Sequence, residues 1–164
     1  MDLDSLGLKP GQGERLEVAI RPEGLALGGQ SYDFGEADIP ARVEISRTVS
    51  GYAMRLCLEA ALAGPCMRCL EPARFSIAVD VREVDQPGVE DEELSSPYVD
   101  EGSLDLAAWA HDAIALALPA QLLCRPDCAG LCPECGISLN DADSGDHAHE
   151  REPDSRWAAL RDLN

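Results

Sequence analysis

Aromatic side chains and long apolar runs are scarce in this chain of 164 residues. Phe, Trp and Tyr make up 4% of the residues, although hydrophobic residues in total reach 45%. The longest apolar run covers residues 113–118, far below the roughly 20 residues that a membrane-spanning helix needs. The first ten residues carry two aspartates and no basic cluster, so we expect neither a signal peptide nor a membrane span and place the protein in the cytoplasm.

Basic residues are also few: 13 Lys and Arg stand against 31 Asp and Glu, which gives a formal net charge of −18. Phosphate would repel such a chain, which excludes an autonomous nucleic-acid binder by bulk electrostatics and favours basic proteins as partners. RNA contact would have to use the arginines of the first half, and these are Arg15, Arg21, Arg42, Arg47, Arg55, Arg68 and Arg74. Because no aromatic stacking motif accompanies them, we interpret them as solvated strand positions.

Alternating apolar and polar residues predict a β-rich first part with one buried face. The strands are expected over residues 15–20, 42–49, 52–62 and 73–81, with a short strand within 25–34. Ser50 and Gly51 predict one turn, and Gly64 and Pro65 predict another. The second turn places the CMRC sequence of residues 66–69 at the end of a hairpin.

Residues 83–102 are acidic and rich in Pro and Gly, which is typical of a solvated connector. Ser103 or Asp105 can cap a helix that Pro119 ends, and a second short helix is expected from Pro153 to about residue 160. We therefore predict an α+β fold. It has a β-rich part with its connector over residues 1–102, and a helix with a Cys-rich zinc-knuckle segment over residues 103–164, within one compact domain.

Seven cysteines in a reducing compartment indicate metal ligation rather than disulfides. Two CxxC pairs, a further cysteine pair and a histidine pair supply eight candidate ligands: Cys66, Cys69, Cys124, Cys128, Cys132, Cys135, His147 and His149. Paired CxxC motifs across a long insertion are typical of zinc sites, because each motif presents two ligands in a preset geometry. Cys57 has no cysteine at ligand spacing, and we interpret it as a packed thiol.

The ligands can be divided in two ways, which predict one or two zinc ions. One division gives a site from Cys66, Cys69, Cys124 and Cys128 and a second from Cys132, Cys135, His147 and His149. The other gives a single ribbon from Cys66, Cys69, Cys132 and Cys135. Spacing alone leaves both open.

Catalysis is the less favoured role for these residues, because a surplus of ligands would fill the open position that a catalytic zinc keeps. Glu134 lies within a Cys-Pro-Glu-Cys sequence, but the His-x-Glu element of the zinc deaminases is missing from the sequence. Neither CxxC opens a helix of a βαβ unit, which disfavours a thioredoxin-like role. The acidic residues 141–146 resemble a calcium loop, but Asp146 stands where that loop needs glycine, so we interpret them as a solvated linker.

Four segments together resemble the YceD-like family of large ribosomal RNA subunit accumulation proteins. They are PCMRCL at residues 65–70, LDL at 104–106, IALALP at 114–119, and the Cys-rich segment 124–140 that ends in Leu139 and Asn140. Many members carry Cys-x-Cys after the second CxxC, where this chain has His147 and His149, which keeps the capacity to bind zinc.

The resemblance implies a role in accumulation or processing of large-subunit ribosomal RNA. Joined to the charge, it leads us to expect a non-enzymatic, zinc-binding assembly factor whose partner is a basic ribosomal protein or a pre-ribosomal particle. The alternatives are a metal-dependent enzyme that processes RNA and a zinc-ribbon adaptor in transcription.

Overall fold

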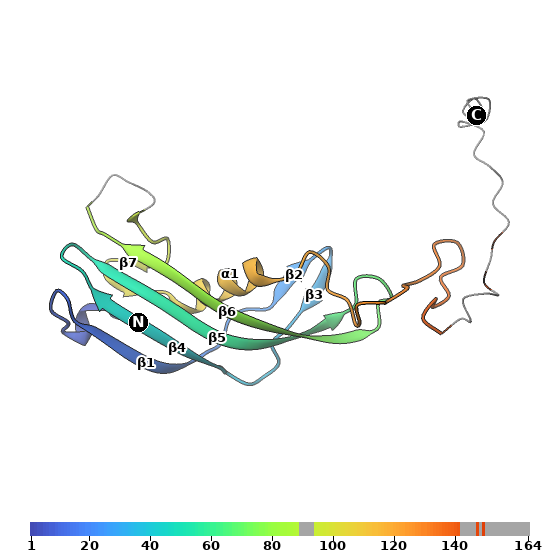
Figure 1. Cartoon of the computed structure of the whole chain (residues 1–164), viewed down its shortest axis with the longest axis horizontal. Helices are drawn as coiled ribbons and strands as arrows, with labels where there is room; N and C mark the ends of the chain where they lie inside the picture. Colours follow the sequence, from blue (N-terminus) through green and yellow to red (C-terminus); the bar gives the residue numbers. More distant parts are fainter. Residues whose placement is uncertain (89–93, 142–146, 148, 150–164) are drawn as a thin grey trace, which may run out of the picture.

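A four-stranded antiparallel sheet is the largest element of the protein. The computed structural model describes residues 1–88, 94–141, 147 and 149. The strands are β1 (Gly13–Ile20), β4 (Ile39–Arg47), β5 (Tyr52–Pro65) and β6 (Pro72–Asp85), and they lie in the order β1-β4-β5-β6 (Figure 1). Because neighbouring strands in space also follow one another in the chain or nearly so, short connections build most of the sheet.

Smaller elements flank this sheet. Two short hairpins are formed by β2 (Leu25–Leu27) with β3 (Gln30–Tyr32) and by β7 (Val99–Asp100) with β8 (Ser103–Leu104). A 3-10 turn, η1, covers Asp4–Leu6, and one α-helix, α1, covers Leu106–Ala117. Within the described residues, the fold is thus mostly antiparallel sheet with one helix.

The core lies between one face of the sheet and α1, which packs against β6 and β1. Alternate residues of β4 and β5 point into it, and Val43, Ile45, Leu56 and Leu62 are fully buried. On the helix, Trp109 and the residues one turn away fill the same space. The apolar face of the strands, where every second residue is apolar, therefore packs against the apolar stripe of the helix, which repeats about every 3.6 residues.

The helix begins and ends as the sequence predicts. The side chain of Asp105, rather than Ser103, caps it by accepting a hydrogen bond from the N–H of Ala108 at 3.0 Å. Leu118, the residue before Pro119, has the extended backbone that a following proline favours. The second helix, expected from Pro153, lies outside the described residues.

The acidic connector is where the sequence-based expectation is wrong. Residues 83–85 continue β6, and the β7–β8 hairpin occupies residues 99–104. Asp85 is buried and accepts a hydrogen bond from the N–H of Ser96 at 3.3 Å. The acidic run therefore includes the end of β6. Asp85 is accommodated there because the backbone N–H of Ser96 donates to its carboxylate.

Two strands extend beyond the rest of the sheet and form an arm, which consists of residues 59–65 of β5 and 72–78 of β6. The pairing of β4 with β5 ends at Leu58, whereas β5 and β6 stay paired up to Pro65. Gly64 and Pro65 therefore end a strand instead of making the turn expected of them. The turn is residues 66–71, the tip loop.

The β2–β3 hairpin supports this arm. Asp33 and Ala63 exchange backbone hydrogen bonds of 2.8 and 2.9 Å, and the hydroxyl of Tyr32 donates to the carbonyl of Pro65 at 3.1 Å. The Tyr32 ring is buried and lies where a side chain on Gly64 would be. The tip loop is thereby held at one end of the sheet, next to the Cys-rich segment that follows α1 and extends beyond it (Figure 1).

No helix among the described residues is both long and apolar enough to cross a membrane.

Candidate metal centre

The tip loop folds as a knuckle around its two cysteines. The N–H of Leu70 donates to the carbonyl of Cys66 at 2.9 Å, and the N–H of Cys66 donates to the carbonyl of Glu71 at 2.8 Å. The N–H of Arg68 points at the Cys66 sulfur from 3.5 Å. This tight turn requires a left-handed backbone after the second cysteine, and Leu70 adopts it with φ of 63°.

The CPECG sequence forms a second knuckle with the same hydrogen bonds. The N–H of Gly136 donates to the carbonyl of Cys132 at 2.8 Å, and the N–H of Cys132 donates to the carbonyl of Ile137 at 2.8 Å. Gly136 has φ of 72°. It occupies the position that Leu70 holds in the first knuckle, but without a side-chain penalty.

Four thiols meet where the tip loop touches the segment after α1. They are Cys66, Cys69, Cys124 and Cys128, and their sulfurs all lie within 4.8 Å of one another. The pairs Cys66–Cys128 and Cys69–Cys124 are 3.7 and 3.6 Å apart, too far for disulfides. Zinc–sulfur bonds of about 2.3 Å in a tetrahedron would place the sulfurs about 3.8 Å apart. The spacing therefore fits one zinc ion held by four thiolates.

A second group combines the other knuckle with the histidine pair: Cys132, Cys135, His147 and His149, again within 4.8 Å. The Nε2 atoms of the two histidines are 3.1 Å apart, and each lies 3.2–3.4 Å from a cysteine sulfur. About 3.3 Å between nitrogens and about 3.6 Å from nitrogen to sulfur follow from tetrahedral zinc. The donor set and its spacing therefore fit a second zinc ion.

A carboxylate stands behind one of these histidines. Glu134 Oε2 lies 3.3 Å from Nδ1 of His149, on the ring side opposite to the Nε2 that faces the sulfurs. Histidines that bind metal usually place their other nitrogen against such a carboxylate, which fixes the ring and its tautomer. Glu134, which the sequence connects only with deaminase chemistry, thus has an orienting position here.

Burial and hydrogen bonds give the thiols very different acidities. Burial raises the pKa of Cys66, but N–H groups that donate to its sulfur outweigh this and lower the pKa to about 6. Burial and neighbouring thiols raise the pKa of Cys124 to about 12. His147 and nearby N–H groups lower the pKa of Cys132 to about 6. Each group therefore contains one thiol that ionises more readily than an ordinary cysteine, and a divalent cation would displace the remaining protons on binding.

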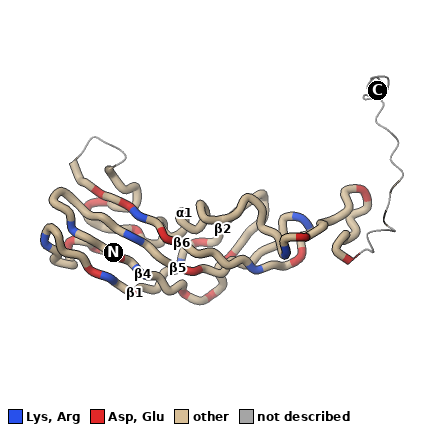
Figure 2. Tube along the Cα trace, viewed as in Figure 1, with Lys and Arg blue, Asp and Glu red and all other residues tan. Residues whose placement is uncertain are grey.

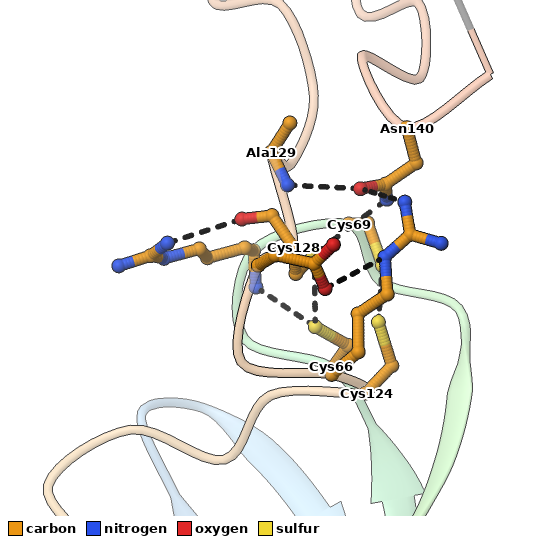
Figure 3. A network of polar contacts seen from close by, with 9 residues as sticks. Cys66, Cys69, Cys124, Cys128, Ala129 and Asn140 are labelled. Carbon is orange, nitrogen blue, oxygen red and sulfur yellow. Dashed lines mark hydrogen bonds and ion pairs between the residues drawn. The ribbon is translucent and has the colours of Figure 1, made fainter.

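Polar side chains around the first group tie its parts together (Figure 3). The guanidinium of Arg68 donates to the carbonyl of Cys128 at 3.0 Å and to Gln121 at 3.1 Å. The amide of Asn140 donates to the Cys128 sulfur at 3.5 Å and accepts from the N–H of Ala129 at 2.8 Å. Spacing rules for ligands do not identify Arg68 or Asn140. The one available signal for Asn140 is its place at the end of the family motif.

All eight ligands expected from the sequence lie in one of these two groups. The structure places Cys66 and Cys69 with Cys124 and Cys128, and it does not bring them to Cys132 and Cys135 as a single ribbon requires. Binding of zinc by these residues stays a prediction. Of the acidic stretch that resembles a calcium loop, residues 142–146 lie outside the described part.

The family model for the large ribosomal RNA subunit accumulation protein YceD matches residues 54–164. Uncharacterized proteins of Mycobacterium tuberculosis and Mycobacterium bovis are each 35% identical to this chain, over 99% of its length and 80% of theirs. One of Mycobacterium leprae is 36% identical over 60% of this chain and 46% of its own length. No solved structure matches. With the family model covering both cysteine groups, the chain belongs to the YceD family of large ribosomal RNA subunit accumulation proteins.

Proposed function

We propose that this protein is a non-enzymatic zinc-binding factor that supports accumulation of large-subunit ribosomal RNA during ribosome assembly in the cytoplasm. The observation that carries the proposal is that eight side chains form two sets of four ligand atoms. Both sets have the donor types of structural zinc sites, and the atoms of each set lie close enough together to share one ion. The family description supports the connection to ribosomal RNA.

The role proposed for both ions is structural. Catalytic zinc needs one coordination position for water or substrate, whereas four protein ligands occupy all positions of a tetrahedron. An ion among Cys66, Cys69, Cys124 and Cys128 would join the tip loop to the segment after α1, which is more than 50 residues away in the sequence. Structural zinc contributes about 10 kcal/mol of apparent binding free energy or more, which is comparable to the stability of a whole domain.

Electrostatics favour a basic ribosomal protein, alone or on a pre-ribosomal particle, as the partner. The chain has a net charge of −18, and zinc does not reverse it. A zinc ion with four thiolates adds two negative charges, and one with two thiolates and two neutral imidazoles adds none. Long-range attraction therefore acts on cationic proteins, and such association weakens as salt is added.

Contact with RNA would have to be local, because three arginines of the sheet, Arg15, Arg42 and Arg55, are already paired with acids. Arg15 lies 2.8 Å from Glu44, and Arg55 makes two hydrogen bonds of 2.6 and 2.7 Å to Asp80. Basic and acidic positions are interspersed along the strands (Figure 2). A surface with interspersed charges can orient a bound partner, but it attracts an RNA phosphate backbone only weakly.

The test uses a host whose own family member has been deleted. We expect the wild-type chain to restore the ratio of large-subunit to small-subunit ribosomal RNA, and a Cys128→Ser variant to fail. The Cys57→Ser variant is the matched control, because Cys57 is outside both ligand groups. Restoration of the ratio by Cys128→Ser to the wild-type level would contradict the proposal.

The partner is identified by co-purification at low and at high salt. We expect ribosomal particles or a basic ribosomal protein at low salt, and release at high salt. RNA cleavage by the purified protein would instead support the enzyme alternative. Co-purification with RNA polymerase in place of ribosomal particles would support the transcription adaptor.

A further inference from the structure

Asn140 lies between the two ligand groups. It follows the second knuckle in the chain and precedes His147, yet its side chain reaches a ligand of the first group, Cys128 (Figure 3). Its Nδ2 lies 3.5 Å from the Cys128 sulfur. Its Oδ1 accepts from the N–H of Ala129 at 2.8 Å and from the guanidinium of Arg125 at 3.0 Å.

These partners fix the orientation of the amide. The Ala129 N–H and the Arg125 guanidinium are donors only, so they require the oxygen of Asn140 on their side. The NH₂ group must then face the sulfur. An N–H donor directed at a metal-bound thiolate offsets part of its charge, and such outer contacts hold a ligand in the geometry that the metal needs.

The backbone holds Asn140 against the first group through the same hairpin that forms the second knuckle. The N–H of Leu139 donates to the carbonyl of Gly130 at 2.8 Å, and the N–H of Leu131 donates to the carbonyl of Arg68 at 3.2 Å. The second knuckle is therefore flanked by two contacts with the first group, one from Leu131 to Arg68 and one from Asn140 to Cys128. Ordering this hairpin positions Asn140.

We propose that Asn140 couples the two metal sites: an ion bound by Cys132, Cys135, His147 and His149 orders the hairpin, and Asn140 then strengthens metal binding at Cys128 and its three partner thiols. This inference rests on the proposed metal binding. Because coupling between two binding sites is reciprocal, an ion in the first site also strengthens binding in the second.

The experiment measures metal affinity of the four-thiol site by competition between the reduced full-length protein and a chelator of known affinity. Zinc gives the affinities. Cobalt identifies the sites, because its absorption distinguishes four thiolates from two thiolates with two imidazoles. The variants are Asn140→Asp, which keeps the acceptor oxygen but cannot donate to sulfur, and Asn140→Ala, which adds no charge. Gln86→Ala is the control, because this amide accepts from Ser50 at the end of β6 that lies away from the tip loop.

We expect both Asn140 variants to weaken the four-thiol site by about tenfold or more, as loss of an outer-sphere partner does in other metal sites, while Gln86→Ala leaves it unchanged. We also expect the cobalt–thiolate bands of that site to shift in both Asn140 variants. Removal of the second site by Cys132→Ser with Cys135→Ser should weaken the four-thiol site in the wild-type background and have little further effect in Asn140→Ala.

Three results would overturn the coupling. The first is a metal affinity of the four-thiol site that is unchanged in Asn140→Ala. Any effect of Asn140→Asp would then come from its added negative charge and not from the lost N–H donor. The second is a second-site effect of the same size with and without Asn140. Both leave the proposed zinc sites standing. The third, a wild-type chain that takes up neither zinc nor cobalt, would overturn the metal sites along with the coupling.

Discussion

Leu70 allows a sharp test of the knuckle geometry, because it is a bulky residue in a left-handed conformation. Its φ of 63° matches the 72° of Gly136 at the same position of the second knuckle. Its side chain is 53% exposed, so packing does not hold it there. Strain at this position should therefore appear when Leu70→Gly is compared with Leu70→Ala, since both variants lose the same side-chain contacts.

The size of the difference follows from two opposing terms. A left-handed backbone costs a residue with a Cβ about 1–2 kcal/mol, and glycine avoids this cost. Glycine also gains about 0.4–1 kcal/mol of freedom in the unfolded chain, which works against it. With the middle of each range, Leu70→Gly should therefore be more stable than Leu70→Ala by about 0.8 kcal/mol, the reverse of the usual order.

Denaturant unfolding at a fixed excess of zinc measures the difference, with circular dichroism as the signal. Val49, which is 91% exposed in the turn after β4 and does not have positive φ, is the control position. There the glycine variant should be the less stable one. If Leu70→Ala were as stable as Leu70→Gly or more stable, the left-handed knuckle would be refuted.

Three further predictions concern the arm, the sheet and the metals. Gly64→Ala should cost about 1–3 kcal/mol, as overpacking does, because the new methyl group meets the Tyr32 ring; thermal unfolding checks this, and an unchanged midpoint would contradict the contact. Arg55 lowers the pKa of Asp80 to about 2 through hydrogen bonds. Since this lies below the usual value near 3.9, the stability gained from ionised Asp80 is complete above about pH 4 and lost as the pH falls to about 2. Asp80→Asn should thus destabilise at neutral pH, and its difference from wild type in denaturant titrations should shrink as the pH falls through about 2; an equal difference at neutral and at the lowest pH would exclude the ion pair as its cause. Chelation of zinc should speed amide hydrogen exchange in the tip loop and residues 122–140 while the strands paired with β4 keep their protection, and uniform protection throughout would argue against structural ions.

The sequence predicts those parts of the fold whose signal is local. Alternation of apolar and polar residues locates the four long strands. Asp105 caps the helix, as expected of a short polar residue just before an apolar helical pattern. The sequence misplaces the ends of β5 and β6 for a common reason. These strands end in Pro65 and Asp85, and both residue types are uncommon in strands. Pro65 is tolerated because β5 no longer pairs with β4 at that point and is there an edge strand, and Asp85 is stabilised by Ser96, a partner 11 residues away.

The same distinction applies to the candidate site. Spacing identifies the ligands, because two cysteines separated by two residues bind one ion wherever the knuckle lies. It does not identify Asn140, whose contact with Cys128 depends on how a hairpin packs against the tip loop. Nor does it identify the strain at Leu70, because leucine gives no signal of a left-handed backbone. Contacts formed only by packing need the structure.

We expect the chain to hold two zinc ions in separate sites. Elemental mass spectrometry of protein purified without added metal tests it most directly, on wild type, Cys128→Ser and Cys132→Ser. We predict two zinc ions per chain for wild type and one for each variant, with the far-ultraviolet circular dichroism of the sheet kept. A single zinc ion in wild type that Cys132→Ser removes, or no zinc at all, would contradict two separate zinc sites.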